Sequence, residues 1–596
     1  MDASGSPGAA PRVSRTELVW PGKYGNGASP DSPERRRISF EAAELHPGLL
    51  EDPGTAWRNR LYLGDNLDVL GSLLEELSGG IDLIYLDPPF ATGLDFKAAV
   101  EVGEGRGVRG QDGARLPGSR RRRDGAVEGS AYRDVWGSDP GPYLVMLQER
   151  MEAVRTLLAP SGTVFVHVDR RAAHHVKLLL DDVFGPERLL NEIIWCYTGP
   201  SSPGMRAFSN KHDSIFWYAK GPTWTFNVDA VRLPYKESTK RNEGRRTGFT
   251  TGNPDLVVVL NPLGKYPEDW WTIPVEAPAS AVRTGYPTQK PERLLERVIR
   301  AASNPDSLVA DFFCGSGTTL AVAEKLGRRW IGSDTSPLAV HTVRKRILGI
   351  AGRRSFEIRE ERRAESRRGP LPGSASTSAP IERRALELHG ASFAAEGEGW
   401  VEGSRGDVLV LVKLEDEPLT IDRARSALDA CRRARARELH VLSLAWEPGA
   451  PDIFHAGAAE TGAAVSLFRI AREAAGSPLC IVEVPRLDVE VSVAGPRCAA
   501  ASVRGLVFRH RERLSGAARD KAVAWSDLLD FWSVDWDWRG GPLEADFVAC
   551  RTRAVRAIPL ECSTSGYGAP GAYRVLVEAV DIFGNAAWAL RLVNVS

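Results

Sequence analysis

The sequence lacks the features that mark secreted, zinc-binding and membrane proteins. Its seven cysteines are scattered and odd in number, and no two of them form a C-x-x-C pair. This pattern argues against a disulfide framework or a zinc site and favours a reducing cytoplasm. No uninterrupted apolar run approaches the ~20 residues of a membrane helix, and the N-terminus has no signal-peptide core. We therefore expect a cytoplasmic protein with no membrane partner.

An excess of charge of either sign is also missing. The chain has 77 basic and 77 acidic residues, a formal net charge of zero. Nucleic-acid-binding proteins are usually basic, so the composition by itself does not indicate one. A large enzyme can confine its positive charge to one groove, however, and a polyanionic partner is not excluded. With 596 residues, 43% of them hydrophobic, the chain is long enough for three or four folded domains.

Helical and strand patterns alternate along much of the chain. An apolar strand is predicted at Ile81–Leu86, an amphipathic helix from Pro142 to Leu158, and another strand at Thr163–Val168. This alternation is typical of an α/β fold with a parallel sheet. We expect a disordered tail over 1–36, an α/β domain over 37–350 with a flexible insertion at 101–130 and an irregular basic region at 197–280, a linker over 351–380, and a C-terminal domain over 381–596.

A small-residue turn follows the predicted strand that ends at Asp311. Gly315 and Gly317 allow the backbone to approach a ligand closely, and the helix expected after them offers free N–H groups. Asp334 follows Asp311 near the ~20-residue spacing at which an acidic residue reaches ribose hydroxyls. The turn is not G-x-G-x-x-G, which argues against NAD or FAD, and the chain has no phosphate-binding loop for ATP.

A second candidate site is Asp87-Pro88-Pro89-Phe90, directly after the strand 81–86. Catalytic groups of open α/β sheets lie beyond the carboxyl ends of strands. The two prolines have no N–H, so nearby carbonyls stay free to accept hydrogen bonds. With the Asp87 carboxylate and the Phe90 ring, the segment suits a planar group that carries an NH₂. The alternative is a structural Pro-Pro turn with Phe90 in the core.

The third segment is Pro287-Thr288-Gln289-Lys290-Pro291, before an apolar helical stripe. Thr288 is expected to cap the helix that starts near Pro291.

The three segments, in this order, resemble the β class of DNA amino-methyltransferases over residues 57–350. Asp87 to Phe90 looks like the catalytic motif, and Gly64-Asp65-Asn66 is similar to the segment near the cofactor's adenine. Thr288 and Lys290 look like the motif for the methionine carboxylate. The cofactor loop of the family is matched by Asp311, Phe313, Cys314, Gly315, Ser316 and Gly317, with Phe312 where the family commonly has proline.

The resemblance implies a Rossmann-like methyltransferase sheet of seven strands, circularly permuted so that the catalytic half comes first. It implies S-adenosylmethionine as cofactor, double-stranded DNA as partner, base flipping and no metal. Asp87, where cytosine-N4 enzymes typically have Ser, favours N6 of adenine. The target-recognition region would be 197–280, and its candidate DNA-binding residues are Arg232, Lys236, Lys240, Arg241, Arg245 and Arg246.

Other parts of the sequence leave alternatives open. His167-Val-Asp169 and His212-Asp213 look like stretches of the longer family members, which are related to the modification subunits of type III restriction systems. A separate restriction subunit and a homodimer therefore stay open as partners. Cytosine-N4 methylation, a protein or RNA amino group as substrate, and an inactive DNA-binding module of a defence system are the competing functions. The region 381–596 is expected to be α+β or β-rich, with its tryptophans in the core, and has no assigned role.

Overall fold

Five β-sheets and the helices around them make up the part of the chain that the computed structural model describes. That part consists of residues 19–20, 23, 38–48, 57–90, 94–101, 126–134, 139–199, 206–244, 257, 259–277, 280, 282–363, 379–397, 400–413, 419–444, 446–447, 449–472, 479–507, 524–552 and 555–596. Among these residues, no helix is both long and apolar enough to span a bilayer.

The largest sheet has eleven strands in the order β22-β1-β12-β2-β11-β10-β3-β6-β8-β7-β9. All neighbours from β12 to β6 are parallel, whereas β1 and β8 run antiparallel to the strands beside them in this run. The strands are β1 (Ile38–His46), β2 (Asn59–Leu63), β3 (Ile81–Leu86), β6 (Leu158–Val168), β7 (Leu189–Cys196), β8 (His212–Ala219), β9 (Trp270–Thr272), β10 (Leu308–Asp311), β11 (Arg329–Asp334), β12 (Phe356–Arg363) and β22 (Leu543–Glu544).

Strands β10 and β3 lie side by side although more than two hundred residues separate them in the chain. Val309 pairs with Leu83, and Ala310 with Ile84. After β3 the chain crosses over to β6 on one side, and after β10 it crosses over to β11 on the other. Ligands of open α/β sheets bind where the strand order reverses in this way, beyond the carboxyl ends of the strands.

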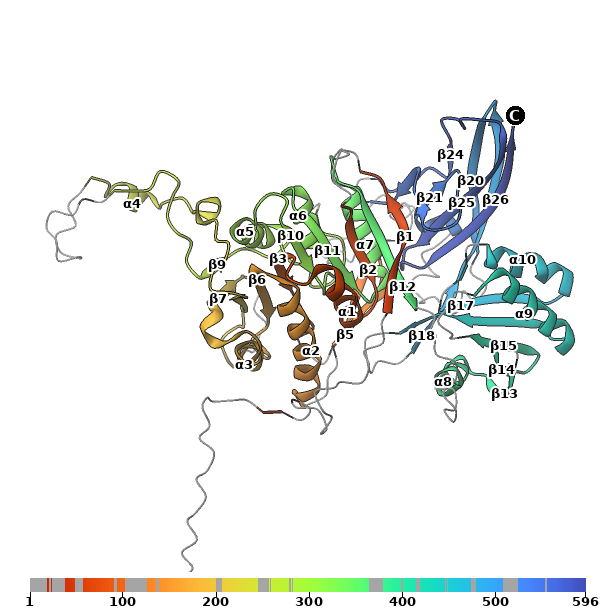
Figure 1. Cartoon of the computed structure of the whole chain (residues 1–596), viewed down its shortest axis with the longest axis horizontal. Helices are drawn as coiled ribbons and strands as arrows, with labels where there is room; N and C mark the ends of the chain where they lie inside the picture. Colours follow the sequence, from red (N-terminus) through yellow and green to blue (C-terminus); the bar gives the residue numbers. More distant parts are fainter. Residues whose placement is uncertain are drawn as a thin grey trace, which may run out of the picture.

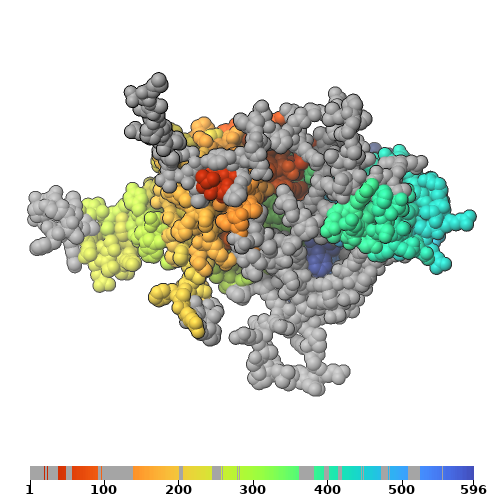
Figure 2. Space-filling view, turned by 90° about the horizontal axis from the view of Figure 1, so that it is seen from below, coloured from red at the N-terminus to blue at the C-terminus, as the bar shows by residue number. Residues whose placement is uncertain are grey.

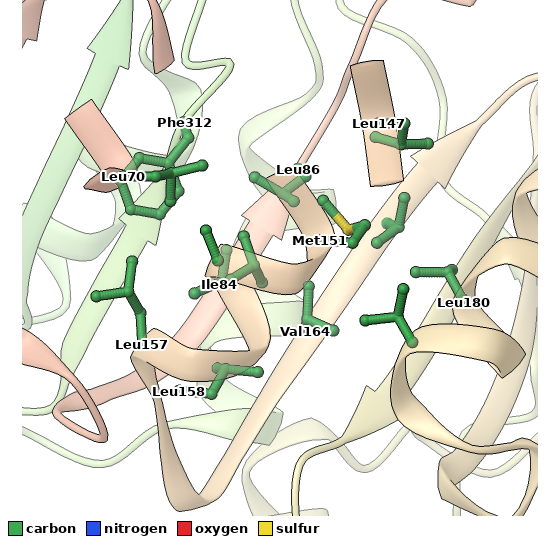
Figure 3. Close-up of a cluster of buried hydrophobic side chains, with 14 of the residues drawn as sticks. Leu70, Ile84, Leu86, Leu147, Met151, Leu157, Leu158, Val164, Leu180 and Phe312 are labelled. Atoms are coloured by element: carbon green, nitrogen blue, oxygen red, sulfur yellow. The ribbon is translucent and has the colours of Figure 1, made fainter. Parts of the chain in front are cut away.

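Helices cover both faces of this sheet (Figure 1). One core contains residues of α1 (Asn66–Leu77), α2 (Gly141–Leu157) and α3 (Ala173–Phe184), and the other contains residues of α5 (Glu292–Ala302), α6 (Thr318–Lys325) and α7 (Pro337–Leu348). Side chains of a strand alternate between the two: Ile84 and Leu86 face the first core, and Leu83 and Tyr85 the second. Figure 3 shows Ile84 and Leu86 in the first core. Burial on both faces explains why β3 is almost continuously apolar.

The C-terminal region contains two separate folds. The first is a six-stranded sheet with three helices: α8 (Ala379–His389), β13 (Ser392–Gly397), β14 (Trp400–Arg405), β15 (Val408–Lys413), α9 (Ile421–Ala434), β16 (Glu438–Ser443), α10 (Ala450–Thr461), β17 (Ala464–Arg472) and β18 (Leu479–Val484). The second packs a three-stranded sheet on a four-stranded one: β19 (Arg486–Gly495), β20 (Cys498–Val507) and β24 (Glu561–Ser563) against β21 (Leu529–Asp535), β23 (Phe547–Cys550), β25 (Gly571–Asp581) and β26 (Ala586–Val595). We call this second fold the sandwich.

The sandwich has a core of its own, which includes Trp532 and Trp536. Trp538 is also buried, at 6% exposure, so these tryptophans are core residues, as predicted. The hairpin expected near Gly584 is formed by β25 and β26, which pair antiparallel.

Several predicted boundaries were wrong. The sheet has eleven strands rather than seven, because β1, β12, β22 and β9 extend it at both edges. The linker predicted over 351–380 contains β12. The C-terminal region, predicted as one domain from 381, contributes the strand β22 to the eleven-stranded sheet. Six of the eight residues of β12 are charged, three glutamates and three arginines, so its sequence has little of the apolar pattern of a strand. Pairing with the distant strands β1 and β2 overrides that composition.

The two segments predicted to be unstructured are ordered in part. In the insertion predicted at 101–130, the residues from Ala126 belong to β5 (Ala126–Asp134), which pairs with β4 (Leu94–Glu101). In the tail predicted at 1–36, Trp20 is buried in the first core and the Lys23 ammonium contacts Asp182 of α3 at 2.5 Å. Single anchoring residues of this kind produce no periodic pattern in a sequence.

Helix α7 joins the sandwich to the main sheet through buried charges. His341 and Lys345 bind Asp530 of β21 at 2.8 and 2.6 Å. Arg344 binds Glu44 of β1 at 2.8 Å and Glu578 of β25 at 3.5 Å. Burial raises the pKa of Glu44 to about 7 and that of Glu578 to about 8, while Arg344 opposes both shifts. The guanidinium is therefore the cation that offsets two buried carboxyl groups.

We expect Arg344→Met to lower the free energy of unfolding by roughly 3–5 kcal/mol, because it leaves buried carboxyl groups without their cation. Denaturant-induced unfolding measures the change. The matched control is Arg432→Met, which breaks an exposed ion pair with Asp429 and should cost less than about 1 kcal/mol. Equal, small losses in the two variants would show that the buried pair does not hold the sandwich to the sheet.

Candidate active site

The turn after β10 has a shape that only glycine permits at two positions. Gly315 and Gly317 have φ angles of 49° and 69°, in the left-handed region. A Cβ atom on Gly315 would lie 3.3 Å from the ring of Tyr286, and one on Gly317 would lie 2.6 Å from a methyl group of Val343. The turn therefore packs its bare backbone closely against Tyr286 and Val343, just before α6 begins at Thr318.

Two carboxyl groups, the buried Asp311 and the half-buried Asp334, hold this turn. Asp311 accepts hydrogen bonds from the Thr319 hydroxyl at 2.6 Å and the Phe313 N–H at 3.0 Å. Asp334, at the end of β11, accepts from the N–H groups of Gly315 and Ser336, each at 2.9 Å. Burial raises the pKa of Asp311 to about 7 and that of Asp334 to about 6. Asp334 thus lies beside the turn, and each of its oxygens keeps a second lone pair for a ligand.

The segment expected near the cofactor's adenine is tied to the same turn. Asn66 donates from Nδ2 to the Phe312 carbonyl at 2.8 Å. Arg150 of α2 donates to Asn66 Oδ1 at 2.5 Å and to Asp65 Oδ1 at 2.8 Å. Arg150 was not predicted as a site residue. Its position between Leu147 and Met151, on the buried stripe of α2, is the signal that could have identified it.

The other residues of the predicted cofactor loop are mostly internal. Phe312, which replaces the family's usual proline, puts its ring into the first core, as Figure 3 shows. Cys314 is buried, and burial raises the pKa of its thiol well above the ordinary value. Arg346 of α7, another residue that the sequence did not indicate, donates to the Ser316 carbonyl at 3.1 Å and the Thr318 hydroxyl at 3.0 Å.

Asp87 lies at the carboxyl end of β3, beside this turn. Its Oδ2 accepts a hydrogen bond from the Lys290 ammonium. Its Oδ1 is buried, and no donor of the described residues reaches it. The Lys290 ammonium also lies 5.1 Å from the centre of the Phe90 ring, and the Phe90 N–H donates to Asp134 at 3.1 Å. The structure thus brings the segments Asp87–Phe90 and Pro287–Pro291 into direct contact.

The predicted cap of α5 was wrong. The helix starts at Glu292 with Pro291 at the N-cap position and no side-chain cap. Thr288 adopts a left-handed φ of 55° three residues earlier, and its carbonyl accepts a weak hydrogen bond from Lys290 at 3.5 Å. Thr288 is too far from the helix start in sequence to act as its cap, and instead shapes the turn that carries Lys290.

The predicted DNA-binding residues differ in their surroundings. Arg232 binds Asp229 at 2.6 Å and the Gly264 carbonyl at 2.9 Å, and it stacks on Tyr266, so its side chain is only 6% exposed. Lys236, Lys240 and Arg241 are exposed. Arg245 and Arg246 lie outside the described residues.

The exposed basic residues lie on or beside α4 (Glu237–Lys240). We call the part of the chain around α4 the arm, because it extends away from the sheet (Figure 1). In Figure 2 this yellow-green arm lies at one end of the molecule, opposite the cyan C-terminal fold. The arm also exposes large apolar side chains, namely Trp224, Phe226, Tyr266 and Trp270.

We expect Gly317→Ala to destabilise the protein more than Gly327→Ala. Both glycines have left-handed φ angles, 69° and 70°, so each alanine incurs a backbone penalty of roughly 1–2 kcal/mol. Only at Gly317 does the new methyl group also meet Val343, whereas nothing lies within 4 Å at Gly327. This overlap should add roughly 1–3 kcal/mol, measured by denaturant unfolding. Equal losses would mean that the turn is not tightly packed on α7.

Comparisons with known proteins find similarity to DNA methylases. Residues 81–345 match the family model N6_N4_Mtase, described as DNA methylase. The type II methyltransferase M.EcaI of Enterobacter cloacae is 26% identical over 397 residues, which cover 57% of this chain and 79% of that protein. M.BglII of Bacillus subtilis is 32% identical over 206 residues, 32% of this chain and 53% of M.BglII, so the match spans about half of that relative.

Among solved structures, the M1.HpyAVI–SAM complex matches with 18% identity and a TM-score of 0.31, covering 49% of this chain and 99% of that one. The family model and the curated relatives alone thus show that residues 81–345 are similar to the N6/N4 DNA methylases, with type II methyltransferases among the matches.

Proposed function

We propose that this protein is a site-specific DNA methyltransferase that transfers a methyl group from S-adenosylmethionine to N6 of adenine. One observation carries the proposal: Asp87 and the Gly315–Gly317 turn follow adjacent parallel strands, so both emerge at the same edge of the sheet. The similarity of residues 81–345 to the N6/N4 DNA methylases supports the same conclusion.

The residues of the crevice fit S-adenosylmethionine. Gly315 and Gly317 leave part of the turn without side chains, and Asp334, which accepts from the Gly315 N–H, is the candidate for the ribose hydroxyls. Asp65 and Asn66 are the candidates for contact with the adenine, as the resemblance implies. When bound, the cofactor supplies a methyl group on a positively charged sulfur.

Lys290 and Thr288 are the candidate partners of the methionine carboxylate. Lys290 already binds Asp87, but an ammonium has three N–H donors, so it can bind a second carboxylate as well. In that arrangement Lys290 connects the cofactor to the catalytic carboxylate. Its predicted role in cofactor binding therefore extends to Asp87.

The catalytic segment acts on the exocyclic amine of the flipped base. Because Lys290 occupies Oδ2 of Asp87, the free Oδ1 is the oxygen that accepts one N–H of the amine. The Pro88 carbonyl accepts the other N–H, and the Phe90 ring stacks on the base. These contacts localise the nitrogen lone pair and aim it at the methyl carbon, so positioning and oriented hydrogen bonds supply the catalysis. Methyl transfer from the bound cofactor would leave the amine with one surplus proton, and Asp87 would be the base that accepts it.

The exposed arm is the candidate for DNA contact. A target base inside a duplex must be flipped out, at a cost of a few kcal/mol that contacts in the pocket offset. Lys236, Lys240 and Arg241 can bind backbone phosphates, which would make binding strongly dependent on salt. Arg232 shapes the arm from inside, because its guanidinium binds Asp229 and Gly264.

Cytosine-N4 methylation is the second candidate, because the family model covers both N6 and N4 enzymes. Asp87 in the catalytic motif favours adenine. Enzymatic digestion of DNA after incubation with the protein and S-adenosylmethionine, followed by mass spectrometry of the nucleosides, distinguishes the two. We expect N6-methyladenine; N4-methylcytosine would replace the adenine proposal, and unmodified DNA would favour an inactive DNA-binding module.

Asp87→Ala should reduce methyl transfer by roughly 10²-fold or more, because it removes an acceptor aimed at the amine. The incorporation of labelled methyl groups into DNA measures the rate, and circular dichroism verifies the fold. Near-normal transfer by a folded variant would refute the mechanism. Asp82→Ala serves as the control for loss of a carboxylate from the same strand. Asp82 lies at the far end of β3, and among the described residues its carboxylate accepts one hydrogen bond, from the Leu308 N–H at 2.8 Å.

Asp334→Ala should weaken S-adenosylmethionine binding while largely sparing DNA binding, because Asp334 lies at the cofactor turn and far from the arm. Calorimetric titration with the cofactor and a fluorescence anisotropy titration with labelled duplex measure the two affinities separately. An equal loss of both would contradict this division of roles.

A further inference from the structure

Two motifs that the proposed mechanism does not use meet behind the catalytic segment. His167 lies on β6, the neighbour of β3, and Asp213 lies at the start of β8, the neighbour of β6. His167 is completely buried and Asp213 nearly so, at 8% exposure. Because β8 runs antiparallel to β6, the start of β8 lies beside the end of β6. Both residues therefore lie at the edge of the sheet from which the catalytic segment emerges.

Hydrogen bonds fix both nitrogens of His167. The Tyr85 hydroxyl lies 2.7 Å from Nδ1, and Asp213 Oδ2 lies 3.2 Å from Nε2. Burial raises the pKa of Tyr85 well above its ordinary value, so its hydroxyl keeps its proton and donates to Nδ1. Nε2 then carries the hydrogen and donates to Asp213, whose other oxygen accepts from the Tyr197 hydroxyl at 3.2 Å. Burial tends to raise the pKa of Asp213, but the hydrogen bonds from His167 and Tyr197 and the nearby charge of Lys290 lower it overall.

The imidazole ring fixed in this way packs against Phe90. The two ring centroids are 5.8 Å apart with a tilt of 36°. Trp195 holds the imidazole from another direction, edge to face at 5.4 Å. Phe90 itself has two further anchors, its N–H bond to Asp134 and the Lys290 ammonium 5.1 Å from its ring. The orientation of the Phe90 ring therefore depends on an imidazole that cannot rotate without breaking two hydrogen bonds.

We propose that His167 and Asp213 form a positioning pair that sets the tilt of the Phe90 ring against which the target base stacks. The inference rests on the proposed function, because it assigns Phe90 to the base. Neither residue needs to touch the substrate. A small error in the tilt of the base displaces its amine from the line of methyl transfer, and misplacement of about 1 Å can reduce a rate by roughly 10²-fold.

The first test compares two buried histidines. His167→Gln should lower kcat for DNA methylation by roughly 10- to 100-fold, with the dissociation constant for S-adenosylmethionine changed less than twofold. The control is His440→Gln, since His440 is equally buried in the six-stranded C-terminal sheet and is hydrogen-bonded to His389 at 2.7 Å. It should lower the melting temperature to a similar extent and leave kcat unchanged. Equal losses of kcat in the two variants would show a general structural effect and overturn the proposal.

The second test measures stacking directly. A duplex with 2-aminopurine at the target base, once wild-type methylation has located that base, reports its environment because contact with an aromatic ring quenches the fluorescence. We expect the His167→Gln complex to be several-fold brighter than the wild-type complex. Equal brightness would mean that Phe90 holds its position without His167, and the proposal would be wrong.

The third test asks whether the two residues act as a unit. Asp213→Asn should reproduce part of the kcat loss, and the double variant should lose no more than His167→Gln alone, because residues in one network are not additive. Additive losses would contradict a shared role. Failure of the proposed function is distinguishable from all of these results, since the wild-type protein itself would then not methylate DNA.

Discussion

The parallel pairing of β3 with β10 is the constraint on which the rest of the structure depends. It joins Val309 to Leu83 and Ala310 to Ile84 across more than two hundred residues of intervening chain. Because both strands point the same way, Asp87 and the Gly315–Gly317 turn emerge at one edge of the sheet. A register shift of one residue would turn the core residues of β3 to the opposite face and separate the two segments.

The parts of the site that could be predicted are those encoded by local signals. The strand at Ile81–Leu86, the glycines at 315 and 317 and the acidic residue at 334 each follow from a short stretch of sequence, and the structure has strands and a turn at these places. The contacts of Lys290 with Asp87 and of Arg150 with Asn66 could not be predicted, since each joins elements that are far apart in the chain. Pairing between strands that are far apart in the chain also explains the edge strands of the sheet that were not predicted.

Helix α7 gives the C-terminal sandwich a structural connection to the cofactor turn. On one side, Arg344 binds the buried carboxyl groups of β1 and β25. On the other, Val343 packs against Gly317 and Arg346 donates to the Ser316 carbonyl. The hairpin at Gly584 also touches the first turn of α7, where an added Cβ would lie 2.7 Å from the Pro337 carbonyl oxygen. The sandwich therefore helps to support the Gly315–Gly317 turn, which is the proposed cofactor site.

The central claim is that a methyl donor and a hydrogen-bonded amine meet between β3 and β10. A crystal structure of the protein with a non-reactive analogue of S-adenosylmethionine tests it most directly. We expect the analogue to lie over the Gly315–Gly317 turn, with the group that replaces the methyl directed toward Oδ1 of Asp87 across a gap wide enough for a base. An analogue bound elsewhere, or one whose reactive end is turned away from Asp87, would contradict it.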